Sequence, residues 1–228
     1  MKNYLLMYLK RYQRAIIGTM RDRREPQWLA WAREIQALSQ TGLHFNQDRF
    51  NVQRYRRLME IAAEIVSAQS QVEKDTALDD FQLQGGYTTP KVDVRGAVVK
   101  NNRILLVKER ADGRWCMPGG WADVGETPSE MVEREVWEES GFVVKARRVI
   151  GVYDANRGDQ PLSFYHAYKI VFECELLSGE PTPSEETEAV EFFPFDDPPI
   201  LSSVRTNERH LGDVEAFITD PNRAAQFD

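Results

Sequence analysis

Apolar residues in the first third of the chain recur with the period of an α-helix. They fall in three segments: Trp28, Trp31, Ala32, Ile35 and Leu38; Val52, Tyr55, Leu58, Met59, Ala62, Ile65 and Val66; and Leu78 with Phe81. Pro26 starts the first segment, Gly42 follows it as a helix stop, and Asp48 is a suitable N-cap for the second. Two or three short helices are too small to bury their apolar faces by themselves. We therefore expect a small helical region over 25–84 that packs on the following domain or on a second subunit, as in a homodimer.

After Gly85-Gly86 the apolar period changes to two, which is typical of β-strands. The pair Asn101-Asn102 tolerates left-handed backbone and separates two such runs, so it predicts a β-hairpin. Other expected elements are strands at Arg148–Tyr153, Phe164–Leu177 and Glu191–Phe195, and helices at Pro128–Ser140 and His210–Thr219. Strands interleaved with helices predict an α/β domain with α/β/α layers and a mixed sheet over 87–220.

Composition is that of an ordinary globular protein, with 42% hydrophobic and 29% charged residues. No apolar run approaches the roughly 20 residues that cross a bilayer, so no stable membrane insertion is expected. A net charge of -7 disfavours a dedicated duplex-DNA binder, which normally carries a basic surplus. The chain has only two cysteines, Cys116 and Cys174. This favours two reduced, buried thiols in a cytoplasmic protein over a disulfide framework or a zinc site.

The negative charge is concentrated in two zones. Residues 120–140 hold seven carboxylates with one basic residue, and residues 173–197 hold nine carboxylates with no Lys or Arg. By contrast, residues 1–24 carry seven basic groups and one acidic group. This basic extension fits an amphipathic helix that touches anionic lipid or RNA, and it fits a frayed extension equally well, so no function is assigned to it.

The first acidic zone predicts a helix with one carboxylate face. Thr127 is expected to cap its start and Gly141 to end it. Within the helix, Glu135, Glu138 and Glu139 stand at i, i+3 and i+4, so they share a face. Like charges at this spacing destabilise a helix by about 0.2–0.5 kcal/mol per pair, and their clustering therefore calls for a cause beyond solvation.

A glycine-rich loop, Pro118-Gly119-Gly120, precedes this helix. Glycine lets a backbone carbonyl or amide approach an ion or a phosphate closely. Three carboxylates and a carbonyl are hard oxygen ligands, which suit Mg²⁺ or Mn²⁺ and do not suit zinc. With substrate phosphate oxygens completing the shell, such a site can hold two divalent ions about 3.5–4 Å apart.

The segment Gly120–Phe142 resembles the Nudix box, G-x5-E-x7-R-E-U-x-E-E-x-G-U, at every fixed position. The resemblance implies the Nudix fold, an α/β/α sandwich with a mixed sheet, here preceded by a small N-terminal helical hairpin. The family's site residues carry over by matching position: the metal ligands Glu135, Glu138 and Glu139 with the Gly120 carbonyl; Arg134, which orients the glutamates; and Glu126, which supports the loop.

The resemblance extends beyond the box. Val92–Glu109 fits the first Nudix strands, and the block that begins at Pro161, with the helical hairpin, resembles a subgroup that includes CDP-choline pyrophosphatases. This implies a Mg²⁺- or Mn²⁺-dependent pyrophosphohydrolase for a nucleoside diphosphate linked to a small group, with CDP-choline, which yields CMP and phosphocholine, as the first expectation. ADP-ribose, other nucleotide sugars and RNA ends are the alternatives. A non-enzymatic sensor is disfavoured because the box carboxylates are intact.

The second acidic zone falls where Nudix enzymes often place a further glutamate in a mobile loop. Glu186 is the first expectation for an extra metal ligand or general base, and Glu188 is the second. Glu139 is the other candidate base. For contacts with the substrate's base and phosphate the candidates are Tyr153, Phe164, Tyr165 and His166, although each fits a core position better.

Overall fold

The computed structural model describes residues 26–83, 85–156, 164–220 and 222–228. These residues divide into two compact units, one comprising the described residues up to Pro90 with Asn156 and 164–166, the other comprising the described residues of 91–155 and 167–228. We call them the helical unit and the sheet unit. The grouping of 164–166 with the helices is not suggested by the sequence pattern. The basic extension 1–24 lies outside the described residues.

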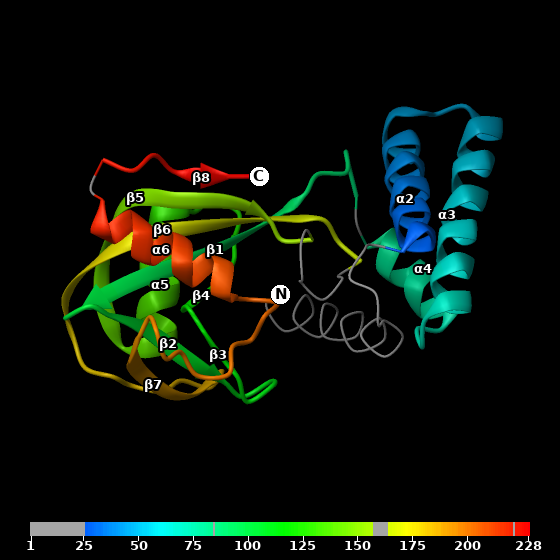
Figure 1. The fold of residues 1–228 in the computed structure, drawn as a ribbon. Coiled ribbons are helices and arrows are strands. Elements are labelled where there is room, and N and C mark those ends of the chain that lie inside the picture. The colour runs from blue at the N-terminus through cyan, green and yellow to red at the C-terminus, as the bar shows by residue number, and fades with distance from the viewer. Residues whose placement is uncertain (1–25, 84, 157–163, 221) are drawn as a thin grey trace. The chain divides into compact units, whose positions relative to one another are not determined.

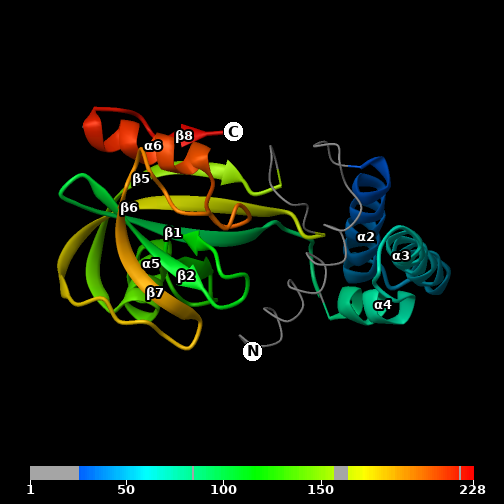
Figure 2. The same cartoon turned by 60° about the horizontal axis from the view of Figure 1, so that its bottom comes forward.

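The helical unit contains three described helices, α2 (Gln27–Phe45), α3 (Arg49–Gln69) and α4 (Lys74–Gln82), drawn in blue to green in Figures 1 and 2. Asp48 caps α3 as predicted, because its side chain accepts a hydrogen bond from the Asn51 N–H at 2.9 Å. The core gathers apolar residues of all three helices around Phe81, whose ring stacks on Phe164 with 4.8 Å between centroids.

One expectation for α2 is wrong. Gly42 does not end the helix, which continues to Phe45. Gly42 is buried, and a Cβ there would overlap the Tyr55 ring, so this glycine permits the close approach of α3. Trp31 and Leu38, which belong to the predicted apolar face, are 55% and 59% exposed, so this part of the face does not pack within the helical unit. The core stripe of α2 instead runs through smaller and polar residues: Leu29, Ala32, Gln36, Ser39 and Gln40.

The sheet unit begins with the predicted hairpin, β1 (Lys91–Lys100) and β2 (Arg103–Glu109). Asn101 and Asn102 form its turn, with φ of 53° and 57° in the left-handed region. The other strands are β3 (Trp115–Cys116), β4 (Gly119–Trp121), β5 (Phe142–Asp154), β6 (Ala167–Gly179), β7 (Thr187–Pro194) and β8 (Gln226–Phe227). The sheet order is β3-β2-β1-β6-β5-β8, with β4 also paired to β1 and β7 to β2. It is mixed, because β1–β6 and β5–β8 are parallel and the other pairs are antiparallel.

A helix covers each face of this sheet, α5 (Pro128–Ser140) on one and α6 (Glu208–Thr219) on the other. Alternate residues of β2 divide accordingly: Leu105 and Val107 join the core under α5, whereas Ile104 and Leu106 join the core under α6. The predicted α/β/α sandwich with a mixed sheet, preceded by N-terminal helices, is thereby confirmed.

Some strand bounds differ from those predicted. β6 starts at Ala167 rather than Phe164, because Phe164 lies in the core of the helical unit at 2% exposure. β5 extends N-terminally to Phe142 through a polar stretch that hides the strand period, where Arg148 pairs with Glu173 of β6 at 2.7 Å. No described helix is both long enough and apolar enough to span a bilayer.

Candidate active site

Local sequence fixes the start and end of α5, the helix that carries the carboxylate face. Thr127 caps the helix as predicted and forms a capping box with Glu130: the Thr127 hydroxyl accepts the Glu130 N–H at 3.3 Å, and the Glu130 carboxylate accepts the Thr127 N–H at 3.0 Å. Gly141 ends the helix with φ of 77°. Val132 and Val136 are fully buried against the sheet, so the glutamates take the adjoining face.

Arg134 binds four carboxylates at once. Its Nε and Nη2 each donate to Glu126 at 2.8 Å, while its Nη1 donates to Glu135 and Glu138, both at 2.9 Å. Nη2 also reaches Asp123 at 3.3 Å, a residue that the sequence analysis did not single out. The guanidinium therefore offsets the repulsion among like charges and holds the loop carboxylates beside those of the helix.

Glu139 and Glu135 lie against the backbone of β4. The carboxylate of Glu139 is 6% exposed and accepts the Gly119 N–H at 2.8 Å. Burial raises the pKa of Glu139 well above its usual value, the charge of Glu109 raises it further, and these effects exceed the opposing influence of Arg95. A Cβ at residue 120 would lie 2.9 Å from Glu135 Oε2, so glycine is needed for this carboxylate to approach the strand.

Buried ion pairs lie behind these carboxylates. On β1, Arg95 Nε contacts Asp93 at 3.1 Å, and Arg95 Nη1 donates to the Met117 carbonyl at 3.2 Å, next to the glycine loop. Lys169 of β6 is 1% exposed and lies 3.6 Å from Asp93. Its ammonium also donates to the Val204 carbonyl at 2.9 Å. Burial lowers the pKa of Lys169 to about 8.

Glu109 at the end of β2 is a further buried carboxylate. It lies 3.2 Å from Arg205 Nε and accepts a hydrogen bond from the Cys116 thiol at 3.3 Å. Arg205 also contacts Asp112 at 3.4 Å. Cys116 and Cys174 are both free and buried, as predicted. Arg205 lies more than 90 positions along the chain from Glu109 and Asp112, and no local motif links them. The sequence analysis therefore did not identify this group.

The two loop glutamates have different surroundings. Glu186 is exposed, and its carbonyl accepts the Arg110 N–H at 3.0 Å. The adjacent Thr187 hydroxyl donates to the Glu139 carbonyl at 2.9 Å, which ties the start of β7 to the C-terminal turn of α5. Glu188 forms a surface ion pair with Lys108 at 3.0 Å. Glu186 thus lies on a segment anchored at the carboxylate helix.

The carboxylates on α5 fit a hard divalent cation by donor chemistry, since Glu135, Glu138 and Glu139 offer only oxygen. Within the described ranges, however, no three acidic, histidine or cysteine side chains converge as an ion-holding group. Arg134 engages the first two carboxylates and the Gly119 N–H engages the third. A cation would therefore share these oxygens with protein donors or shift them.

The predicted base-stacking residues are mostly core residues. Tyr153 is 2% exposed, donates its hydroxyl to Asp213 at 3.1 Å and packs on the His210 ring. Phe164 and the partly buried Tyr165 pack in the helical unit. Both placements match the core alternative that the sequence left open.

Comparison with known proteins decides the family. The model of the NUDIX domain matches residues 90–211. A Bacillus subtilis protein named putative ADP-ribose pyrophosphatase YjhB is 37% identical over 204 residues, which cover 90% of this chain and 98% of that protein. The chain belongs to the Nudix family. It is a Nudix pyrophosphohydrolase, and enzymes of this family generally use divalent metal cations.

Two solved structures extend the likeness. A crystal structure of an ADP-ribose pyrophosphatase from Streptococcus suis is 36% identical, covers 61% of this chain and all of its own, and has a TM-score of 0.56. A crystal structure of UDP-X diphosphatase is 29% identical, covers 88% of this chain and 98% of its own, and has a TM-score of 0.58. A second family model, described as a UDP-X-like N-terminal oligomerisation domain, matches residues 26–81 of this Nudix protein. The predicted likeness to CDP-choline pyrophosphatases is not specifically supported.

Proposed function

We propose that this Nudix protein hydrolyses the diphosphate of a nucleoside diphosphate linked to a small group, with Mg²⁺ or Mn²⁺ as cofactor. The observation that carries the proposal is the Arg134 cluster, in which one guanidinium holds Glu126, Glu135 and Glu138 beside Gly120. Concentrated carboxylate oxygen next to a glycine backbone suits a cation bound to diphosphate.

Each residue of the cluster has a proposed role. Glu135, Glu138 and Glu139 hold the cation with the Gly120 carbonyl, Arg134 orients the glutamates, and Glu126 supports the loop. When bound, the cation polarises the diphosphate and lowers the pKa of a bound water.

Glu186 is the proposed general base and further metal ligand. Its side chain is exposed, on a segment tied to α5, and is therefore accessible to a water. Glu139 is the weaker candidate base, because its carboxylate is buried and already accepts the Gly119 N–H.

ADP-ribose and nucleotide sugars are the proposed substrates. CDP-choline stays a prediction and is assayed beside them. Support for these two classes comes from the names of relatives, a putative ADP-ribose pyrophosphatase and a UDP-X diphosphatase. Processing of RNA ends stays a prediction that depends on residues 1–24. A cytoplasmic location is likewise a prediction.

The substrate assignment is tested by incubating the full chain with ADP-ribose, UDP-sugars, CDP-choline and short capped RNA, each with Mg²⁺ and with Mn²⁺. Nucleoside monophosphate release is measured by chromatography. We expect release from at least one nucleoside diphosphate compound, with turnover that depends on the cation. Turnover of RNA alone would favour the RNA alternative, and no monophosphate from any compound with either metal would refute the proposal.

We also propose that the chain is a homodimer. Its support is the match of residues 26–81 to an N-terminal oligomerisation domain, together with large apolar side chains on the surface of the helical unit.

A further inference from the structure

Helix α2 has an apolar stripe on its outward face. Trp31, Leu38 and Phe45 are 55%, 59% and 66% exposed. They are seven residues apart, and two helical turns bring each one above the last, so they form a single line along α2. The three residues are called the α2 stripe here. Its opposite face already packs on α3 and α4, with Leu29 and Ala32 fully buried.

An outward line of Trp, Leu and Phe is typical of a helix that packs on another helix, because exposed apolar surface is stabilised by leaving water. The match to an oligomerisation domain covers all of α2, which makes a second copy of this chain the fitting occupant. The stripe continues beyond Phe45, whose ring meets that of Tyr87 edge to face at 6.4 Å. Tyr87 is itself 65% exposed, so the apolar surface is wider than the helix alone.

Resting on the proposed homodimer, we infer that two copies of the chain meet through the α2 stripe, with the helices antiparallel across a two-fold axis at Leu38. Trp31 and Phe45 are equally far from Leu38 along the chain. Antiparallel pairing therefore sets Leu38 against its own copy and Trp31 against the partner's Phe45, which is the reciprocity that a two-fold interface requires. Aromatic side chains then flank a central aliphatic contact at both ends.

Charge selects the antiparallel direction. Glu34 is the exposed charged residue between Trp31 and Leu38. In a parallel pair the two Glu34 side chains would face each other across the axis. In the antiparallel pair they lie on opposite sides of Leu38, about 12 Å apart along the helix at 1.5 Å per residue. That exceeds the screening length of about 8 Å at physiological salt, so their repulsion is largely removed.

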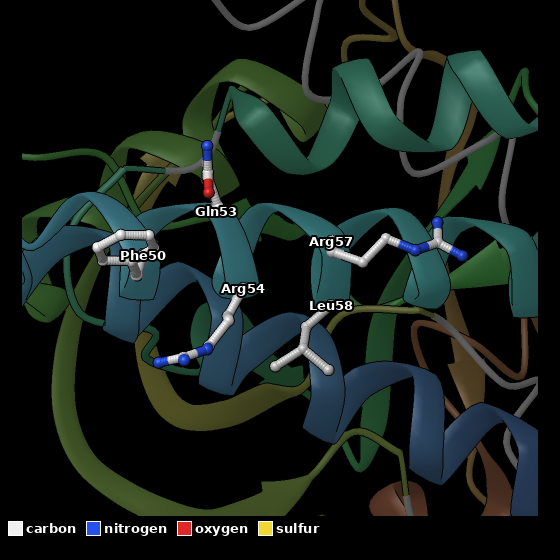
Figure 3. A pocket seen from close by; sticks show the side chains of 5 residues that line it. All are labelled: Phe50, Gln53, Arg54, Arg57 and Leu58. Carbon is white, nitrogen blue, oxygen red and sulfur yellow. The ribbon is translucent and has the colours of Figure 1, made fainter.

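The other exposed face in this unit, on α3, fits a symmetric contact less well. A hollow there is lined by Phe50, Gln53, Arg54, Arg57 and Leu58, which Figure 3 shows along one side of the helix. Its apolar members are separated by arginines, and Arg57 is already paired with Glu64 at 2.9 Å. Two copies of this face would bring arginines together. Phe50, 67% exposed, is therefore a matched control for the stripe.

The first test is the mass in solution by light scattering at micromolar concentration. We expect wild type at twice 26.3 kDa, Leu38→Glu at 26.3 kDa, and Phe50→Glu at the wild-type mass. Circular dichroism checks that both variants stay folded, as expected for exposed positions. If Leu38→Glu kept the double mass, the stripe would be covered by something else, such as residues 1–25, and the inference would be overturned. Dissociation by Phe50→Glu alone would move the interface to α3.

Cross-linking with a short bis-maleimide tests the two-fold axis. Leu38→Cys should link to its own copy, because residue 38 lies on the proposed axis. The native thiols of Cys116 and Cys174 are buried and should not contribute links. Trp31→Cys alone should not link, whereas a mixture of Trp31→Cys with Phe45→Cys should. Linking of Trp31→Cys to itself would overturn the antiparallel arrangement. A wild-type mass of 26.3 kDa would refute the homodimer itself, and monophosphate release, measured in parallel, tests the proposed hydrolysis separately.

Discussion

Replacement of Glu138 by Gln should remove nearly all hydrolysis of the nucleoside diphosphate substrate and leave the protein folded. The Glu138 side chain is 37% exposed at the surface of α5, so the amide causes no packing defect. It contributes a carboxylate oxygen to the proposed cation site, and a neutral amide is a weaker ligand for a hard cation. Loss of about 3–5 kcal/mol of transition-state stabilisation corresponds to a fall of about 10²–10⁴ in turnover. The measurement is the rate of monophosphate release at saturating Mg²⁺.

Glu133→Gln on the same helix is the matched control. Glu133 binds Lys145 at 3.0 Å and the Ala146 N–H at 3.0 Å, away from Arg134, so this variant should keep its turnover. Calorimetric titration with Mn²⁺ supplies a second readout, with weaker binding expected only for Glu138→Gln. Full activity and unchanged Mn²⁺ affinity in Glu138→Gln would show that Glu138 is not a ligand.

The parts of the site that follow from local rules could be predicted from the sequence. The cap at Thr127, the stop at Gly141 and the shared face of the three glutamates depend on spacings within one helix. Arg134 carries the family role of orienting the glutamates, but its partners cannot be read from spacing alone, since Glu130 and Glu138 both lie within one turn of it. The structure pairs Arg134 with Glu138 and Glu126, whereas the capping box engages Glu130.

Contacts between distant parts of the chain could not be predicted. Asp93 and Lys169 are brought together by the parallel register of β1 with β6, and no spacing rule links them. In the sequence, Phe164 continues the apolar pattern of β6, yet its ring packs on Phe81 in the core of the helical unit. The two-residue strands β3 and β8 are too short to show a period.

Lys169→Met should destabilise the sheet unit by about 3 kcal/mol, because breaking a buried ion pair leaves its partners unsatisfied. The Lys169 ammonium pairs with Asp93 and donates hydrogen bonds to the backbone carbonyls of Val204 and Arg205. A methionine side chain fills the volume of the lysine without donating to any of these groups. Lys108→Met is the control. Lys108 pairs with Glu188 at the surface, where such pairs contribute about 0–1 kcal/mol. Urea unfolding measures both, and equal midpoints for the two variants would contradict the argument.

The same lysine gives wild type a distinct pH dependence. The pKa of Lys169 is about 8 in the folded protein, below the ordinary lysine value of 10.5, so between these two values the unfolded chain binds more protons at this group. Stability therefore rises with pH, by about 1 kcal/mol from pH ~7.5 to ~9. Above this window the buried thiols oppose the rise, because burial raises the pKa of Cys174 from 9.0 to about 12 and only the unfolded chain loses that proton. Lys169→Met should lose the rise, and Lys108→Met should keep it. A rise that persisted in Lys169→Met would mean that another group, such as Lys91, whose pKa is also lowered by burial, is responsible.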